Sequence, residues 1–199
     1  MRYVALGDSY TIGTSVPPAE RWPERLVAAV GPPDAPRLEL VANLGVNGAT
    51  SADLIRGQLP GLVGLRPDLV SVLIGVNDVV RGVPPATYAA NLERILAVLL
   101  DRLPPDRIVT ITIPDYTVTP AGGDYGDPRR QHDAIVAANA TMTRLAANAG
   151  IAFVDIFDLS KRAAQDRTLV AADGLHPSGA QYAAWVERIA PIVTGLFAG

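Results

Sequence analysis

A serine stands beside an acid directly after the first apolar run of the chain. The stretch Gly7-Asp8-Ser9-Tyr10 follows Tyr3-Val4-Ala5-Leu6. A serine hydroxyl becomes a nucleophile for acyl transfer when a neighbouring general base takes its proton. Gly, Asp and Ser also form ordinary turns, so the stretch by itself leaves a plain turn open. We interpret Asp8 as a residue that caps or braces this turn and Ser9 as the candidate nucleophile.

The candidate base lies in the stretch "DGLH" near the end of the sequence. Asp173 and His176 are three residues apart, so a single turn can hold the carboxylate against one nitrogen of the imidazole. An ionised aspartate that accepts from one ring N–H fixes the tautomer and leaves the other nitrogen free to accept a serine proton. A purely local hydrogen bond is the alternative reading of this spacing.

Two further stretches supply hydrogen-bond donors for the negative charge that develops on a carbonyl oxygen during acyl transfer. Gly48 lies in "NGATS", where its N–H precedes a predicted helix, and Asn77 lies in "GVND" with a side-chain amide. The N–H of Ser9 is a third donor. Gly48 could instead serve only a tight turn that needs a positive φ, and "GVND" could be a plain turn. The joint occurrence of these stretches favours a catalytic set.

Five β-rich runs, each followed by turn residues and a helical pattern, must position these side chains. The predicted strands are Arg2–Leu6, Leu38–Leu44, Leu69–Ile74, Arg107–Ile113 and Ala152–Phe157. The predicted helices are Trp22–Val30, Ser51–Leu59, Pro85–Arg102, Gln131–Asn148 and a last one from about Gly179 to Thr194. This alternation predicts an α/β fold, a three-layer sandwich around a parallel sheet. Ligands of such sheets bind outside the carboxyl ends of the strands, where all the candidate residues fall.

Length and composition limit the function classes. The 199 residues predict one domain, spanning 1–199, and the net charge of −3 without a basic block argues against a nucleic-acid partner. The absence of cysteine excludes disulfides and thiol catalysis, and the presence of two histidines argues against an imidazole-rich metal site. No apolar stretch reaches the ~20 residues of a membrane helix. Without a leader pattern before Gly7 the chain is expected in the cytoplasm, although a mature secreted form fits equally. The sequence leaves the oligomeric state open.

One connection is unusually long. The segment 114–130, "PDYTVTPAGGDYGDPRR", follows the fourth predicted strand and is rich in Pro and Gly. Long loops at the carboxyl end of a strand often border functional sites, so we expect Tyr116 or Tyr125 near the ligand. A surface loop without such a role is the alternative. His132, beside this segment, is interpreted as a solvated residue.

The chain resembles the SGNH, or GDSL-type, hydrolases in the blocks Gly7-Asp8-Ser9, Gly48, Gly75-Val76-Asn77-Asp78 and Asp173-Gly174-Leu175-His176. The resemblance runs from residue 3 to the last predicted helix, with Tyr10 in place of the usual leucine. It implies a flavodoxin-like five-stranded sheet of order 2-1-3-4-5. It also implies Ser9 as nucleophile, His176 as base, Asp173 as its orienting partner, and an oxyanion hole from Ser9 N–H, Gly48 N–H and the Asn77 side chain.

These observations predict a serine hydrolase that cleaves small-molecule acyl esters through a Ser-bound acyl intermediate, without metal or cofactor. The short chain favours short acyl groups. Deacetylation of carbohydrates and acyl transfer to an alcohol are alternatives that use the same site. A flavodoxin-like flavin-binding protein is a more remote one, since "SYTIGTS" has the hydroxyl content of a phosphate loop but leaves Asn77, Asp173 and His176 without a role.

Overall fold

The computed structural model describes residues 1–30 and 38–197, and its centre is a five-stranded sheet. The strands are β1 (Arg2–Gly7), β2 (Glu39–Asn43), β3 (Leu69–Leu73), β4 (Ile108–Ile111) and β5 (Ala152–Val154). Every pairing is parallel, and the order is β2-β1-β3-β4-β5. The predicted sheet and its order 2-1-3-4-5 are therefore confirmed.

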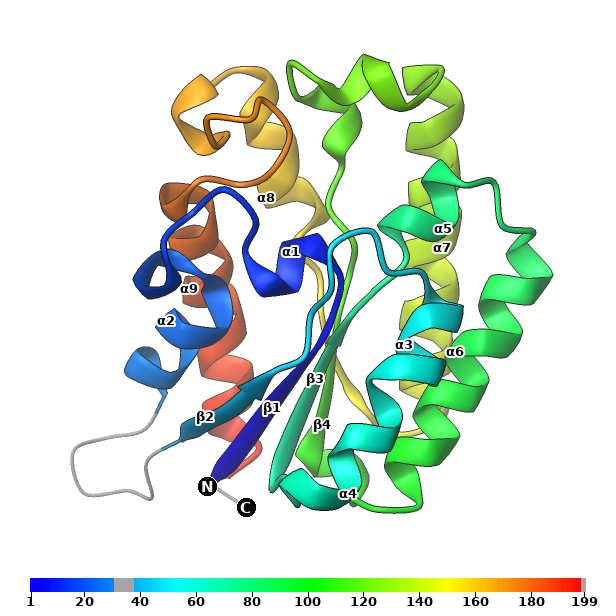
Figure 1. The fold of residues 1–199 in the computed structure, drawn as a ribbon, viewed down its shortest axis with the longest axis vertical. Coiled ribbons are helices and arrows are strands. Elements are labelled where there is room, and N and C mark those ends of the chain that lie inside the picture. The colour runs from blue at the N-terminus through cyan, green and yellow to red at the C-terminus, as the bar shows by residue number, and fades with distance from the viewer. Residues whose placement is uncertain (31–37, 198–199) are drawn as a thin grey trace.

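Helices cover both faces of this sheet, which gives the predicted three layers (Figure 1). The α-helices are α1 (Ser9–Ile12), α2 (Trp22–Ala29), α3 (Ser51–Gly57), α4 (Leu62–Leu65), α5 (Val76–Val80), α6 (Pro85–Leu100), α7 (Pro128–Asn148), α8 (Phe157–Lys161) and α9 (Gly179–Gly195). On one face α2 packs against α9, with α8 beside α9. On the other face α6 packs between α3 and α7. Within the described residues, none of the helices has the length and apolar character that a membrane crossing requires.

The core lies along the central strands because most of their side chains are apolar on both faces of the sheet. Tyr3–Leu6 and Leu69–Ile74 are buried throughout, as continuous runs of this kind predict for strands covered on both faces. The buried Tyr3 hydroxyl is satisfied by Ser71 Oγ at 2.7 Å. At the edge of the sheet burial is incomplete, and Phe153 of β5 is 40% exposed. Each buried Leu, Val or Ile side chain contributes roughly 1.5–3 kcal/mol relative to exposure.

The pairing register brings the ends of β1 and β3 level. Gly7 pairs with Leu73, so the chain leaves both strands at the same edge of the sheet. Ser9 follows β1 by two residues, and Asn77 follows β3 within the first turn of α5. The parallel sheet therefore delivers a hydroxyl and an amide to neighbouring positions, as the sequence predicts.

Candidate active site

The turn after β1 places Ser9 at the start of a short helix. Gly7 passes so close to its neighbours that a Cβ there would lie 2.3 Å from the carbonyl oxygen of Leu73. The buried Gln58 satisfies this turn, since it accepts from Gly7 N at 2.9 Å and donates to Gly7 O at 2.7 Å. Asp8 caps α1 as expected, because its Oδ1 accepts from Tyr10 N at 3.0 Å. Ser9 is 8% exposed at the base of the candidate site.

Asp8 is buried under this turn, where its carboxyl group is shielded from water. Its Oδ2 has no hydrogen-bond partner among the described residues. Burial raises the pKa of Asp8 to about 7, against the Tyr10 N–H, which lowers it, and the carboxylate of Asp78 adds to the rise. Asp8 therefore titrates near neutral pH beside the candidate nucleophile.

Asp173 and His176 form the hydrogen-bonded pair that the "DGLH" spacing predicts. His176 Nδ1 lies 2.6 Å from Asp173 Oδ2, while Asp173 Oδ1 accepts from the backbone N–H groups of Leu175 and His176 at 2.9 and 3.0 Å. Partial burial pushes the pKa of Asp173 upward, but the hydrogen bonds from Ser15, Leu175 and His176 outweigh it and hold the pKa well below its usual range. The ionised carboxylate accepts from Nδ1–H, so Nε2 is left as the basic nitrogen.

Ser15 is a partner of Asp173 that sequence reasoning missed. Its Oγ donates to Asp173 Oδ2 at 2.6 Å, across 158 residues of chain. The backbone of Ser15 has φ +66, which is uncommon for a residue with a side chain. The preceding Thr14 donates its hydroxyl to Asn47 Oδ1 at 2.5 Å. No local sequence pattern predicts either contact. Residues with a strained backbone do occur preferentially at functional sites.

The oxyanion candidates lie on adjacent turns at the same edge of the sheet. Gly48 has φ +75, a backbone conformation that favours glycine, and the turn leads directly into α3. Asn77 Nδ2 donates to Ala49 O at 3.0 Å. Because an amide nitrogen carries two hydrogens, the second N–H of Asn77 remains for a ligand.

A pocket of about 280 Å³ brings most of the predicted site residues together. It is lined by Ser9, Tyr10, Thr14, Asn47, Gly48, Val76, Asn77, Val80, Tyr116, Tyr125, Leu175 and His176. Asp173 stands behind His176, so the hydroxyl, the imidazole and the amide donors face one cavity. In the described part of the chain, no three His, Asp or Glu side chains gather to hold a metal ion.

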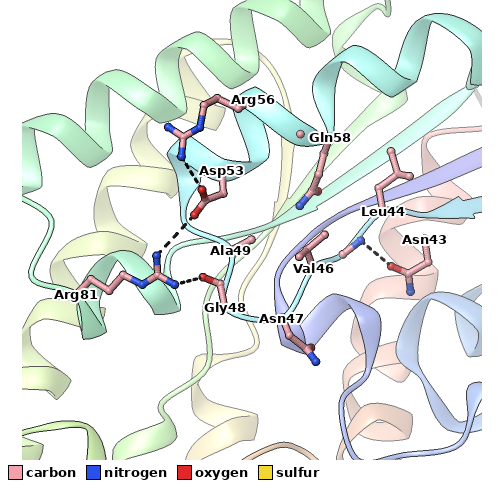
Figure 2. Close-up of a pocket in the computed structure, with 12 residues that line it drawn as sticks. Asn43, Leu44, Val46, Asn47, Gly48, Ala49, Asp53, Arg56, Gln58 and Arg81 are labelled. Carbon is pink, nitrogen blue, oxygen red and sulfur yellow. Dashed lines mark hydrogen bonds and ion pairs between the residues drawn. The ribbon is translucent and has the colours of Figure 1, made fainter.

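A second, larger pocket lies along the Gly48 turn (Figure 2). Its volume is about 730 Å³, and it shares Asn47 and Gly48 with the smaller pocket. Arg56 and Arg81 approach Asp53 from opposite sides in this pocket. The hydrogen bonds from Thr50 to Asp53, together with Arg56, hold the pKa of this carboxyl below its ordinary value.

The long segment 114–130 borders the smaller pocket, as expected. Tyr116 and Tyr125 both line it, with ring centroids 6.0 Å apart in an edge-to-face arrangement. Gln131 joins them, because its Oε1 accepts from Tyr116 Oη and its Nε2 donates to Tyr125 O, each at 2.9 Å. The segment is also tied to the turn of His176, since Ala121 N donates to Gly174 O at 2.9 Å.

His132 differs from its interpretation as a solvated residue. Its side chain is 35% exposed, and its Nδ1 lies 2.7 Å from Oδ2 of the buried Asp115. Thr117 donates both its N–H and its hydroxyl to Asp115 Oδ1. His132 therefore anchors the start of segment 114–130 to α7 and does not line the smaller pocket.

Comparison with known proteins bears on the family and the fold of the chain. A sequence profile described as the GDSL-like lipase/acylhydrolase family matches residues 5–184. An arylesterase of Vibrio mimicus is 34% identical over 105 residues, which are 50% of this chain and 49% of that protein. Two solved structures share the fold. A member of the lipolytic G-D-S-L family from Veillonella parvula has a TM-score of 0.76 at 17% identity and covers 98% of both chains. An acetylxylan esterase from Geobacillus stearothermophilus has a TM-score of 0.74 at 20% identity over 96% of this chain and 93% of its own.

Proposed function

Since the chain belongs to the GDSL-like lipase/acylhydrolase family, we propose that it is a serine esterase that hydrolyses carboxylic acyl esters through an acyl intermediate on Ser9. One observation carries the proposal. Ser9, Gly48, Asn77 and His176 line a single pocket, and Asp173 holds the far nitrogen of the imidazole at 2.6 Å.

In the acylation step Ser9 Oγ attacks the ester carbonyl, and a new Oγ–C bond forms while Nε2 of His176 takes the hydroxyl proton. The carbonyl electrons move onto oxygen, where Ser9 N–H, Gly48 N–H and the free N–H of Asn77 stabilise the charge. Collapse of this intermediate breaks the C–O bond to the alcohol, which leaves with the proton from His176. A water molecule repeats the sequence, releases the carboxylic acid and restores Ser9.

Asp173 supports this proton transfer in two ways. It accepts from Nδ1–H, which fixes the tautomer with Nε2 unprotonated, and its negative charge stabilises the imidazolium that forms in each step. The low pKa of Asp173 keeps its carboxylate ionised at neutral pH.

Short acyl groups fit the smaller pocket best. Its volume of about 280 Å³ is at the low end for ligand sites, and Tyr116 and Tyr125 close one side. The alcohol part of the ester then lies toward the Gly48 turn, where the larger and more polar pocket begins.

Deacetylation of carbohydrates is a second candidate, favoured by that larger pocket. Its lining includes Asn43, Asn47, Asp53 and two arginines, which suit a leaving group rich in hydroxyls. An acyltransferase would use the same site with an alcohol in place of water. Turnover of aryl acetate, acetylated oligosaccharide and aryl acetate with added alcohol separates the three, since only transfer produces a new ester.

The experiment that tests the proposal compares Ser9→Ala, His176→Ala and the double variant on a soluble short-chain aryl ester. Each single change is expected to lower kcat by roughly 10⁴-fold, and the double variant is expected to lose little more, because the two residues act as one unit. Mass spectrometry of the wild type during turnover should detect the acyl group on Ser9. Near-normal turnover by purified, folded Ser9→Ala would overturn the serine mechanism.

A further inference from the structure

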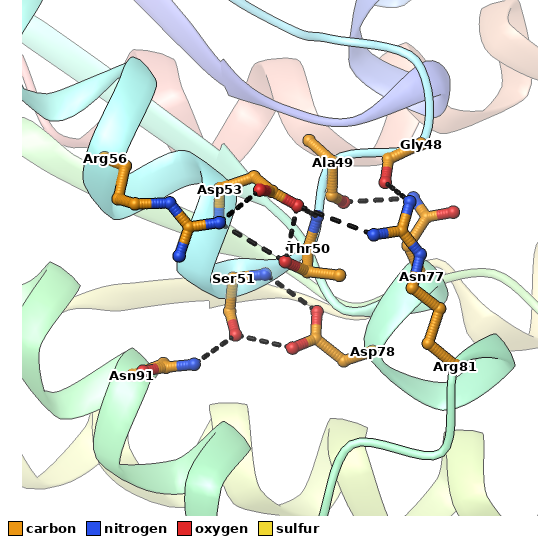
Figure 3. Close-up of polar contacts among 10 residues, drawn as sticks. All are labelled: Gly48, Ala49, Thr50, Ser51, Asp53, Arg56, Asn77, Asp78, Arg81 and Asn91. Carbon is orange, nitrogen blue, oxygen red and sulfur yellow. Dashed lines mark hydrogen bonds and ion pairs between the residues drawn. The ribbon is translucent and has the colours of Figure 1, made fainter.

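The turn that carries Gly48 is held by two side chains, one from the start of α5 and one from the residue that follows this helix (Figure 3). Arg81, the residue that directly follows α5, donates Nη2 to Gly48 O at 2.7 Å. Asn77, one turn earlier, donates Nδ2 to Ala49 O at 3.0 Å. Two successive carbonyls of the turn therefore accept from side chains of one short segment, which consists of α5 and the residue after it.

The start of α3 is fixed independently of Arg81. The buried Asp78 accepts from Ser51 N at 2.8 Å and from Ser51 Oγ at 2.5 Å, and Asn91 of α6 donates to the same hydroxyl at 2.9 Å. Thr50 caps the helix through a reciprocal pair of hydrogen bonds with Asp53. Loss of the Arg81 side chain would thus free the carbonyl of Gly48 while α3 stays in place.

Gly48 needs an external constraint because glycine has the widest choice of backbone conformations. A Cβ atom placed on Gly48 would lie 3.4 Å from Arg81 Nη2. Among the described residues, and apart from the chain neighbours of Gly48, no other heavy atom would come within 4 Å of it. The hydrogen bond from the same nitrogen fixes the direction of the Gly48 carbonyl. Ala49 N, in the same peptide unit, donates to Val46 O at 3.1 Å, so the peptide unit that follows Gly48 is held at its N–H by Val46 and at its carbonyl by Arg81. The N–H of Gly48 belongs to the preceding peptide unit, and the guanidinium acts on it through the backbone of Gly48.

We propose that Arg81 is a positioning residue that holds Gly48 in the conformation in which its N–H stabilises the oxyanion. The inference rests on the proposed function, since it assigns to Gly48 the role of a donor. Arg81 acts through Gly48 and touches no reacting atom. A hydrogen-bond donor stabilises an oxyanion only when it points at the place where the charge develops, so a residue that holds the donor in this orientation contributes to catalysis.

The ion pair between Arg81 and Asp53 is a weaker reason for an arginine at position 81. Arg81 Nη1 lies 3.8 Å from Asp53 Oδ2, and the Arg81 side chain is 56% exposed. Exposed ion pairs contribute little to stability. Asp53 already has Arg56, whose Nη2 lies at 2.6 Å from its Oδ1. The contact with the Gly48 carbonyl is thus the shorter and the more consequential of the two contacts of Arg81.

Arg56 provides a matched control for the experiment. It is an arginine on the same aspartate and lines the same large pocket, but its guanidinium reaches Asp53 rather than a carbonyl of the turn. The variants are Arg81→Met, Arg81→Lys and Arg56→Met. Each is assayed for kcat and KM on a short aryl ester, and for inhibition by an alkyl boronic acid. The boronate forms a tetrahedral adduct with the serine whose oxygen occupies the oxyanion position, whereas binding of the product carboxylate reports the ground state.

Arg81→Met is expected to lower kcat and boronate affinity in parallel, each on the order of 10-fold, with KM and carboxylate binding changed less than about twofold. This loss is smaller than the 10²–10³ expected for removal of a donor itself. Arg81→Lys should recover part of the loss, because an ammonium can still donate to Gly48 O. Arg56→Met should keep the kcat and the boronate affinity of the wild type, because it leaves the bond from Arg81 to Gly48 O in place, and any effect of the pocket charge should appear in KM.

Three results would overturn the proposal. A rise in KM at constant kcat would make Arg81 a substrate contact. Unchanged kcat and boronate affinity in folded Arg81→Met would leave it without a role in the oxyanion hole, and an equal loss in Arg56→Met would assign the effect to the pocket charge. If Arg81→Met does not fold, Arg81→Lys supports the same decision on the boronate alone. Failure of the wild type to bind boronate at Ser9 would instead count against the proposed function.

Discussion

Ser15 and His176 donate to the same carboxylate oxygen. Ser15 Oγ and His176 Nδ1 each lie 2.6 Å from Asp173 Oδ2, although 161 positions separate them in the numbering of the chain. A carboxylate oxygen that accepts from a hydroxyl has less negative charge to offer to an imidazole. The position of the hydroxyl depends on the left-handed backbone of Ser15. The segment that follows Ser9, the proposed nucleophile, therefore also contacts the carboxylate that holds His176, the proposed base.

Ser15→Ala is expected to move the acid limb of kcat/KM to higher pH by roughly half a pH unit, about 0.7 kcal/mol. The sign follows from the charge, because Oδ2 then faces the imidazole alone and favours its protonated, inactive form. The measurement is kcat/KM of a soluble ester between pH 5 and 9. Ser15→Gly, which relieves the backbone but also lacks the hydroxyl, should give the same shift. A shift in Ala without one in Gly would attribute the effect to the backbone.

The wild type is expected to prefer acyl chains of two to four carbons, and Tyr125→Ala is expected to shift this preference to longer chains. Tyr125 lines the small pocket and is 41% exposed, so its removal opens that wall toward solvent. The measurement is kcat/KM over a series of aryl esters from acetate to palmitate. Phe153→Ala is the matched control, an aromatic of similar exposure on the edge strand. A wild type that prefers twelve carbons or more would contradict the short-acyl proposal, and an unchanged profile in Tyr125→Ala would remove this wall from specificity.

His132→Ala is expected to lower the free energy of unfolding by about 1–3 kcal/mol, because the buried Asp115 loses a hydrogen-bond donor. The acid limb of kcat/KM should stay where it is in the wild type, since His132 is absent from the lining of the small pocket. Urea unfolding and the pH profile measure the two effects separately. Displacement of the acid limb by more than about one pH unit would mean that the base has been misassigned.

Asp8→Asn is expected to be more stable than the wild type at alkaline pH by a few kcal/mol, on the order set by 1.36 kcal/mol per pKa unit. Burial raises the pKa of Asp8 to about 7 from an ordinary value of 3.8, so the folded state binds more protons between these two values. Wild-type stability should accordingly fall as pH rises through that window, by linkage. The amide keeps an acceptor for Tyr10 N but does not ionise.

Urea unfolding of the wild type and of Asp8→Asn at pH 5, 7 and 8.5 measures this difference. Asp78 also has a pKa raised by burial, against the hydrogen bonds from Ser51, and it is present in both proteins. The difference between the two curves therefore isolates Asp8. Curves that stay parallel over the whole range would show that Asp8 is ionised at no cost.

The sequence predicts the central strands well and their ends poorly, for a physical reason. Continuous apolar runs identify β1, β3 and β4, but the predicted strand Arg107–Ile113 extends beyond β4 (Ile108–Ile111). Ile113 bonds instead to the side chain of Asn139, whose Oδ1 accepts from its N–H and whose Nδ2 donates to its carbonyl. An apolar pattern contains no information about a partner on a later helix.

The start of α7 shows a signal that was present and missed. The helix begins at Pro128 rather than at Gln131, because Asp127 caps it and accepts from Arg130 N at 2.8 Å. An aspartate followed by proline at the first helical position is a recognised start. In this chain Asp127 and Pro128 lie inside the long connection 114–130.

The candidate site divides along the same line. Residues in short motifs, such as Asp173 and His176, could be proposed because three positions of sequence fix their proximity. Ser15 and Arg81 could not, since each acts on a residue far away in the chain through a contact that only the folded structure creates. Supporting residues of this kind have no characteristic type or spacing.

The hydrogen bond from Ala121 N to Gly174 O joins the segment that carries the two pocket tyrosines to the turn that carries His176. Specificity loops are commonly treated as modules that can be exchanged between related enzymes. In this protein such a graft would replace one end of a hydrogen bond to the turn of His176, the proposed base. A transplanted segment would have to reproduce the backbone of Ala121 as well as its own side chains, or it would change the rate for every substrate at once.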